Sequence, residues 1–190
     1  MQNVAVLVGS LRRDSINLRF AKALEKLAES KLKFTYLDIG SLPHYNDDLW
    51  ANPPESVLTL KRQIAAADGV LFVTPEYMRD IPGVLTNAIY WAARPYGKSA
   101  WNGKPGAIVG TSPGVIGTAA AQVHLRSLLS TINVTLMGEP QVYFQTKPGL
   151  IDDSFTVTDE GSRAFLQGWV DKFSAWIDRH GEERQQAAAE

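Results

Sequence analysis

A short apolar run followed at once by a polar turn constrains the fold of this chain more than any other feature. The run is Val4-Ala5-Val6-Leu7-Val8, the turn is Gly9-Ser10-Leu11-Arg12-Arg13-Asp14-Ser15-Ile16-Asn17, and a helical pattern follows. A strand that enters a helix through a tight turn directs backbone N–H groups and the positive end of the helix dipole toward one point. This order predicts a phosphate-binding turn after a first strand.

Four side chains of the turn can donate hydrogen bonds to an anion. Ser10, Ser15 and Asn17 supply neutral donors. Arg12 supplies a planar and permanently charged donor, and Ile16 completes the expected set of binding residues. The alternative is an ordinary strand-to-helix turn in which Ser15 or Asn17 is the helix N-cap. The convergence of four donors favours a ligand-binding turn.

The turn lacks the signatures of two common phosphate loops. It has no Gly-Lys-Ser/Thr ending, so nucleoside triphosphate hydrolysis is not expected. A dinucleotide fingerprint needs three spaced glycines, and Gly9 stands alone at the start of this turn. A single terminal phosphate, of the kind bound at the carboxyl edge of a flavodoxin-type sheet, fits the turn better.

Apolar runs alternate with helical patterns along the rest of the chain. Because parallel strands need helical crossovers, this alternation predicts an α/β fold: a flavodoxin-like three-layer sandwich with a five-stranded parallel sheet in the order 2-1-3-4-5. In this order the loops after strands one, three and four share one edge of the sheet. Further strands are expected at residues 34–37, 69–73, 106–110 and from 134, interrupted or extended near 138–144, and helices at 18–28, 57–67, 83–93, 118–132 and 165–177.

Composition limits the possible functions and partners. The chain has 190 residues and no linker, so we expect one domain over residues 1–180 and a frayed polar tail over 181–190. A formal net charge of −1, with scattered lysines and arginines, argues against nucleic acid as a partner. The absence of cysteine excludes thiol redox relays, so electron chemistry requires a bound cofactor. The early first strand and the lack of a long apolar run predict a cytoplasmic protein that does not contact a membrane.

The loop after the third strand contains Pro75, Glu76, Tyr77, Met78 and Arg79. Two prolines and a glycine restrict residues 74–83 to few backbone shapes, which suits the presentation of N–H and C=O groups to a planar heterocycle. Tyr77 can lie against such a ring, or it can pack over the next helix in a rigid connector. The sequence leaves both alternatives open.

The loop after the fourth strand contains Ser112 and Gly114 among small residues. Such residues let the backbone approach a ligand closely, although they also form plain turns. The position of this loop beside the other two favours a shared site.

At these positions the chain resembles the NADPH-dependent FMN reductase family, which includes bacterial chromate and quinone reductases. The resemblance extends from Val4 to about Ile177 and implies non-covalent FMN, hydride supply from NAD(P)H, and small acceptors such as quinones, free flavin, azo compounds or chromate-like oxidants. It rests jointly on Gly9-Ser10-Leu11-Arg12, Ser15, Asn17, Pro75-Glu76-Tyr77, Pro82-Gly83, Asn87-Ala88-Ile89, Gly103-Lys104-Pro105, His124-Leu125-Arg126 and Glu139-Pro140.

The resemblance also implies roles for individual residues. The phosphate would be held by Ser10, Arg12, Ser15 and Asn17, the isoalloxazine bordered by Pro75, Glu76 and Tyr77, and its far side met by the loop of Ser112 and Gly114. Because the flavin site of the family lies near a subunit boundary, a homodimer or homotetramer is implied.

One departure from the family concerns Met78, which stands where relatives usually have asparagine. A thioether is a weak acceptor, so a side-chain hydrogen bond to the flavin would be lost. We expect FMN to bind with altered ring electronics or affinity. Arg79 is expected to face the phosphate of the hydride donor or to pair with Asp80.

Three further expectations concern residues outside the motifs. No acid–base dyad is required, because the chemistry would lie on FMN. His124 is expected to pack or to contact a subunit, and Trp50 and Trp101 to cover the flavin or a partner subunit. The alternatives to an enzyme are a flavodoxin-type electron carrier, disfavoured by the near-neutral charge, and a flavin-free nucleotide-binding protein.

Overall fold

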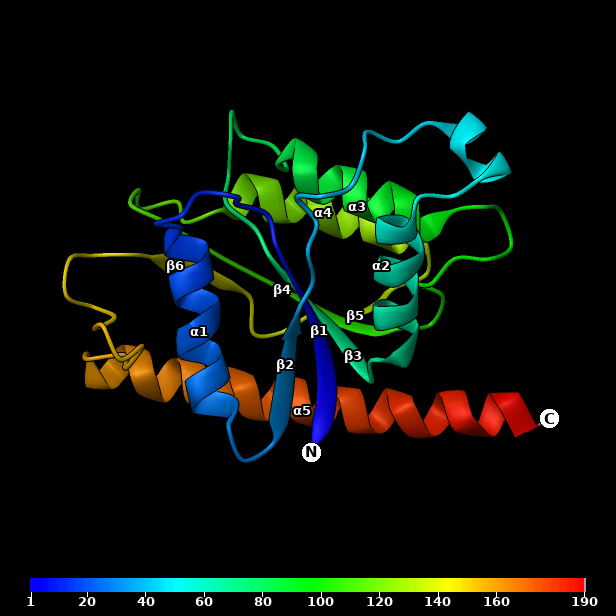
Figure 1. Ribbon diagram of the computed structural model, residues 1–190. Coiled ribbons are helices and arrows are strands. Elements are labelled where there is room, and N and C mark those ends of the chain that lie inside the picture. Colours follow the sequence, from blue (N-terminus) through cyan, green and yellow to red (C-terminus); the bar gives the residue numbers. More distant parts are fainter. Residues whose placement is uncertain (190) are drawn as a thin grey trace.

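The protein folds into a parallel sheet with helices on both faces (Figure 1). The structure, a computed structural model, describes residues 1–189. The sheet order is β2-β1-β3-β4-β5, and β6 also pairs with β4, so the predicted order is confirmed and a sixth strand is added. The strands are β1 (Gln2–Val8), β2 (Leu32–Tyr36), β3 (Gly69–Val73), β4 (Pro105–Ser112), β5 (Thr135–Leu136) and β6 (Val142–Gln145).

The expected fifth strand is divided into β5 and β6, which run beside different parts of β4. Thr135 pairs with Pro105, and Val142 pairs with Val109 further along the same strand. Met137 N still donates to the Gly106 carbonyl at 2.8 Å, and residues 138–141 then leave the sheet. Pro140 in this stretch has no N–H with which to extend a ladder. The sequence indicated an interruption here, and the structure replaces one strand with two.

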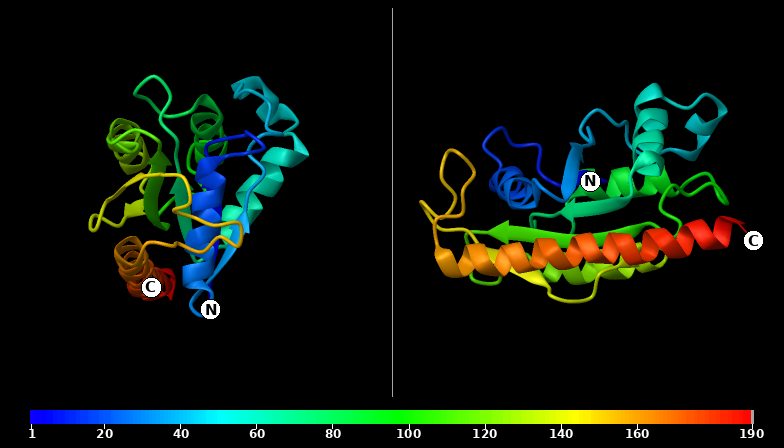
Figure 2. Two further views of the ribbon diagram at one scale, coloured as in Figure 1. Left: turned by 90° about the vertical axis from the view of Figure 1, so that its left-hand side faces the viewer. Right: turned by 90° about the horizontal axis from the view of Figure 1, so that it is seen from below.

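Helices cover both faces of the sheet (Figure 2). One face packs against α1 and α5, and the opposite face packs against α2, α3 and α4. None of the helices within residues 1–189 is long and apolar enough to cross a bilayer. The helices are α1 (Ile16–Ala28), α2 (Glu55–Ala66), α3 (Gly83–Ala93), α4 (Ala119–Ser130) and α5 (Glu160–Ala189), with a short 3-10 helix η1 (Asp47–Ala51) that was not predicted.

Residues 181–189, the tail of the chain, form the last turns of α5. Glutamate, glutamine, arginine and alanine are good helix formers, and adding a residue to an existing helix is easier than starting one. Glu190 lies outside the described residues.

The core alternates along each strand between the two faces. In β1, Val4 and Val6 face α1 and α5, whereas Ala5 and Leu7 face the other helices. Trp101 is fully buried, and its Nε1 donates to the Ile89 carbonyl at 3.0 Å. The expectation that Trp101 covers a ligand or a partner subunit is therefore wrong, because its ring fills the core.

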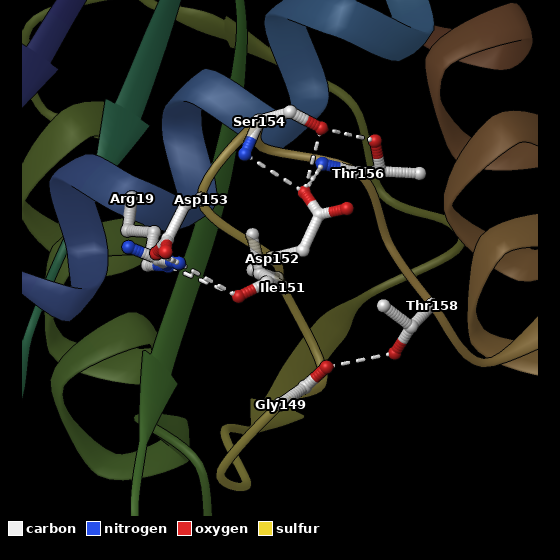
Figure 3. A network of polar contacts seen from close by, with 8 residues as sticks. All are labelled: Arg19, Gly149, Ile151, Asp152, Asp153, Ser154, Thr156 and Thr158. Carbon is white, nitrogen blue, oxygen red and sulfur yellow. Dashed lines mark hydrogen bonds and ion pairs between the residues drawn. The ribbon is translucent and has the colours of Figure 1, made fainter.

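The connection between β6 and α5 is fixed against α1 by a polar network (Figure 3). Asp152 Oδ1 accepts hydrogen bonds from Ser154 N at 3.0 Å and Thr156 N at 2.8 Å. Arg19 of α1 donates to the Ile151 carbonyl at 3.0 and 3.1 Å and pairs with Asp153 at 2.8 Å. The two aspartates thus organise this loop and hold it on α1.

Candidate functional site

Three loops lie together at the carboxyl edge of the sheet, where strand order places ligand sites in such folds. The loops that follow β1, β3 and β4 are called here the first, third and fourth loops after their strands, and they span residues 9–15, 74–82 and 113–118, respectively. They rise at the upper left of Figure 1. All the residues expected at the site belong to these loops, to the ends of their strands or to the first turn of α1.

In the first loop, Ser15 and Asn17 have structural roles. Ser15 is the N-cap of α1, and its Oγ accepts from Leu18 N at 3.2 Å. The Asn17 amide is buried and exchanges two hydrogen bonds with the backbone of Thr111, each 3.0 Å long. The N-cap alternative is therefore right for Ser15. The N–H groups of Ile16 and Asn17 lie in the first helical turn, where a helix provides no acceptor for them.

The other two donors of the first loop are more open. Ser10 is half-buried, and Arg12 is exposed. Arg12 forms part of the wall of a groove of about 390 Å³ that runs between the first and third loops. The groove is lined by Gly9, Leu11, Arg12, Tyr77, Pro82, Gly83 and Val84.

Gly9 allows the first and third loops to meet. A Cβ atom added at Gly9 would lie 3.1 Å from Pro75 Cδ and 3.4 Å from Pro82 Cγ. Gly9 N also donates to the Val73 carbonyl at 2.9 Å, which joins the ends of β1 and β3. This close approach explains why position 9 is a glycine, which a general preference of glycine for turns would not explain.

The third loop ends in a tight reverse turn at residues 77–80. Tyr77 and Asp80 exchange backbone hydrogen bonds of 3.2 and 2.9 Å. Met78 and Arg79 have φ values of 52° and 64°, in the left-handed region that Asn-Gly pairs normally occupy in such turns. Met78 is 97% exposed, and Tyr77, which lines the groove, is 48% exposed. Of the two alternatives for Tyr77, its place in the groove wall favours contact with a ligand.

Glu76 points away from the groove and toward α4. Its side chain is only 6% exposed, with Oε1 accepting from Arg79 Nη1 at 2.8 Å and Oε2 from Ala121 N at 3.1 Å. Burial raises the pKa of this carboxyl, but the hydrogen bonds and the charge of Arg79 outweigh burial and hold the pKa below its ordinary value. Arg79 therefore pairs with Glu76. The alternative in which Arg79 pairs with Asp80 is wrong.

Asp80 instead contacts α4 through His124. Asp80 Oδ1 lies 3.0 Å from His124 Nδ1, and both side chains are largely exposed. The hydrogen bond from His124 is the main reason that the pKa of Asp80 is lowered. Neither this contact nor that of Ala121 with Glu76 was predicted, because each joins residues more than forty positions apart.

The fourth loop is a compact turn of small residues. Ser112 Oγ donates to the Gly114 carbonyl at 3.2 Å, and Gly117 has a φ of 65°. Below it, a Cβ atom at Gly110 would lie 2.1 Å from Thr118 Oγ1 and 2.2 Å from the Thr74 carbonyl. Ser112 and Gly114 lie outside the set of residues that line the groove, so the groove itself joins the first and third loops.

The sequence profile of NADPH-dependent FMN reductases matches residues 2–149. The chain belongs to this family. A 2-hydroxy-1,4-benzoquinone reductase from Burkholderia sp is 50% identical over 174 residues, which cover 92% of this chain and 95% of that protein. A quinone reductase from Pseudomonas putida is 46% identical over 176 residues, covering 92% and 94%.

A solved structure supports the same grouping. FerB, a flavoenzyme NAD(P)H:(acceptor) oxidoreductase from Paracoccus denitrificans, is 53% identical and matches with a TM-score of 0.93 over 95% of this chain and 99% of that chain. A flavodoxin from Pseudomonas aeruginosa, 22% identical with a TM-score of 0.57, shares the fold alone. The expected class, an oxidoreductase that uses FMN and NAD(P)H, is confirmed, and the electron-carrier alternative has less support.

Proposed function

We propose that this chain transfers electrons from NAD(P)H through non-covalently bound FMN to small acceptors, with quinones as the principal class. The names of the Burkholderia and Pseudomonas relatives support quinones as that class. The observation that carries the proposal is the single groove in which Arg12 of the first loop meets the Tyr77 ring and Pro82 of the third. Free flavin, azo compounds and chromate-like oxidants stay predicted acceptors.

The residues present fit FMN. Its phosphate would meet the N–H groups of Ile16 and Asn17, which no helical carbonyl can satisfy, together with Ser10 and the guanidinium of Arg12. Ser15 would contribute mainly by starting α1 in the right place. The groove volume of about 390 Å³ falls in the range of small-molecule sites.

Other residues would border the ring of the cofactor. The backbone of Pro75, Glu76 and Tyr77 would present polar groups to its edge, and the loop of Ser112 and Gly114 would meet its far side. Met78 and Arg79 would stand at the rim. FMN would supply the hydride chemistry when bound, and Arg12 and Tyr77 in the groove wall would orient it.

Two exposed arginines, one at the groove and one far from it, provide the test of the phosphate site. We expect the purified protein to bind FMN, with Arg12→Ala raising the Kd about tenfold because a charge-assisted hydrogen bond is lost. Arg163→Ala is the control, since Arg163 is exposed on α5 and lies outside the groove, and it should leave the Kd within about twofold. Equal Kd values for the two variants would refute the role of Arg12. Failure of the wild type to bind FMN would refute the proposed function.

Three broader expectations from the sequence are also proposals. We propose one FMN-binding domain over residues 1–180, a homodimer or homotetramer, and a cytoplasmic location.

A further inference from the structure

Residues 76–80 of the third loop make two polar contacts with α4, on successive turns of that helix. Glu76 Oε2 accepts from the backbone N–H of Ala121, and three residues later His124 lies 3.0 Å from Asp80. Glu76 also holds Arg79 at 2.8 Å, so one carboxylate contacts both the helix and the tip of the turn.

The turn needs such contacts because its own residues favour other conformations. Met78 and Arg79 both have left-handed backbones, a conformation that is unfavourable for residues other than glycine. Such strain persists only where the surroundings hold the backbone in place. Met78 is 97% exposed and contributes little packing, so the contacts of its neighbours must hold the tip.

Among these neighbours, Glu76 is the residue best placed to hold the tip of the turn. Thr118, the N-cap of α4, makes no side-chain capping bond, so the Glu76 carboxylate takes over that role from another loop. A carboxylate is favourable at a helix N-terminus, where the positive end of the dipole lies. The side chain is 6% exposed, so solvent does not compete for these bonds as it does at the surface.

We propose that Glu76 is a positioning residue that fixes the third loop against the first turn of α4, and thereby sets where the backbone of Pro75 and Tyr77 meets the flavin. This inference rests on the proposed function for its second half only. The position of the loop can be measured without any cofactor.

Limited proteolysis tests the first half. Arg79 is a trypsin site at the tip of the turn, with an exposed side chain. Glu76→Ala should speed cleavage after Arg79 in the flavin-free protein about tenfold, because the charge-assisted bonds that hold the tip are lost. Glu76→Gln should have a smaller effect, since its amide oxygen can still accept from Ala121 N. An unchanged cleavage rate in both variants would overturn the inference.

A second carboxylate cap provides the matched control. Asp159 Oδ2 accepts from Ser162 N at 2.7 Å at the start of α5, so Asp159→Ala removes the same kind of bond from another helix. We expect Asp159→Ala to lower the melting temperature and to leave cleavage after Arg79 unchanged. Equal acceleration by Asp159→Ala and Glu76→Ala would show a general loss of stability and would overturn the positioning role.

Flavin measurements test the second half. We expect Glu76→Ala to raise the Kd for FMN about tenfold and to shift the visible circular dichroism of the bound flavin, with Glu76→Gln rescuing much of both changes. Wild-type Kd and spectrum in Glu76→Ala would overturn this half. If the wild type itself binds no FMN, the proposed function fails while the proteolysis result still decides the position of the loop. If Glu76→Ala does not fold, the cleavage rate after Arg79, the Kd for FMN and the circular dichroism of Glu76→Gln decide the two halves.

Discussion

The side-chain amide of Asn17 and the backbone of Thr111 exchange two hydrogen bonds of 3.0 Å, which join the start of α1 to the end of β4. Both residues are buried, so removing the amide leaves a donor and an acceptor without partners or water. We expect Asn17→Ala to lower the free energy of unfolding by about 2–4 kcal/mol in urea titration. The exposed Asn102→Ala should cost less than about 0.5 kcal/mol. Similar losses of unfolding free energy in the two variants would contradict a stabilising role for the two Asn17–Thr111 hydrogen bonds.

Gly110 is expected to tolerate no side chain. A Cβ atom there would lie within 2.2 Å of both the Thr74 carbonyl and Thr118 Oγ1, so the strand, the third loop and the start of α4 would all have to shift. Gly110→Ala should destabilise the fold by about 3 kcal/mol or more. Gly138, where a Cβ would meet nothing within 4 Å, is the control and should change stability little on substitution with alanine. A Gly110→Ala variant that loses no more stability than Gly138→Ala would be inconsistent with this packing.

Met78→Asn should relieve strain in the turn. Asparagine adopts the left-handed region more readily than methionine, and the exposed thioether gives up little packing. We expect a rise in stability of up to about 1 kcal/mol in thermal unfolding. The new amide should also change the flavin potential or the FMN affinity. A redox titration and a binding titration that both matched the wild type would refute the electronic part.

The stability of the third loop should depend on pH through Glu76. Because the pKa of Glu76 is lowered in the folded protein, its contribution to stability is present above the pKa of the unfolded chain, about 4.3, and is lost as pH falls through the folded value. Unfolding of the wild type and Glu76→Gln should therefore differ most near neutral pH, and the difference should shrink below about pH 4. A difference that stayed constant from pH 7 to pH 3 would argue against the charged contact.

Local patterns predicted the framework well because each depends on neighbours in sequence. The apolar runs at Val4–Val8 and Gly69–Val73 became the central strands β1 and β3, and the glycine-led turn became the start of α1. Strand order followed from the need for crossover helices. The division of the fifth strand was less predictable, since Pro140 weakens a ladder without showing where pairing resumes.

The site was predicted less completely because its geometry depends on distant partners. Asn17 was expected to face a ligand, yet its amide joins β4, and Glu76 was expected at the ring, yet its carboxylate caps α4. Trp101 was expected to cover the flavin or a partner subunit, but its side chain fills the core. In each case the composition of the segment was compatible with both roles, and only the neighbour brought close by folding decided between them.

We propose that the groove beside Arg12 and Tyr77 holds an FMN that passes electrons from NAD(P)H to a quinone. Anaerobic addition of NADPH to the FMN-loaded protein, followed by a benzoquinone, tests it most directly. We predict that the flavin absorbance near 450 nm bleaches with NADPH and returns on addition of the quinone, with no other protein present. A flavin that stays oxidised with both NADPH and NADH, or that recovers only when a partner reductase or carrier is supplied, would show that this protein is not a quinone reductase of this kind.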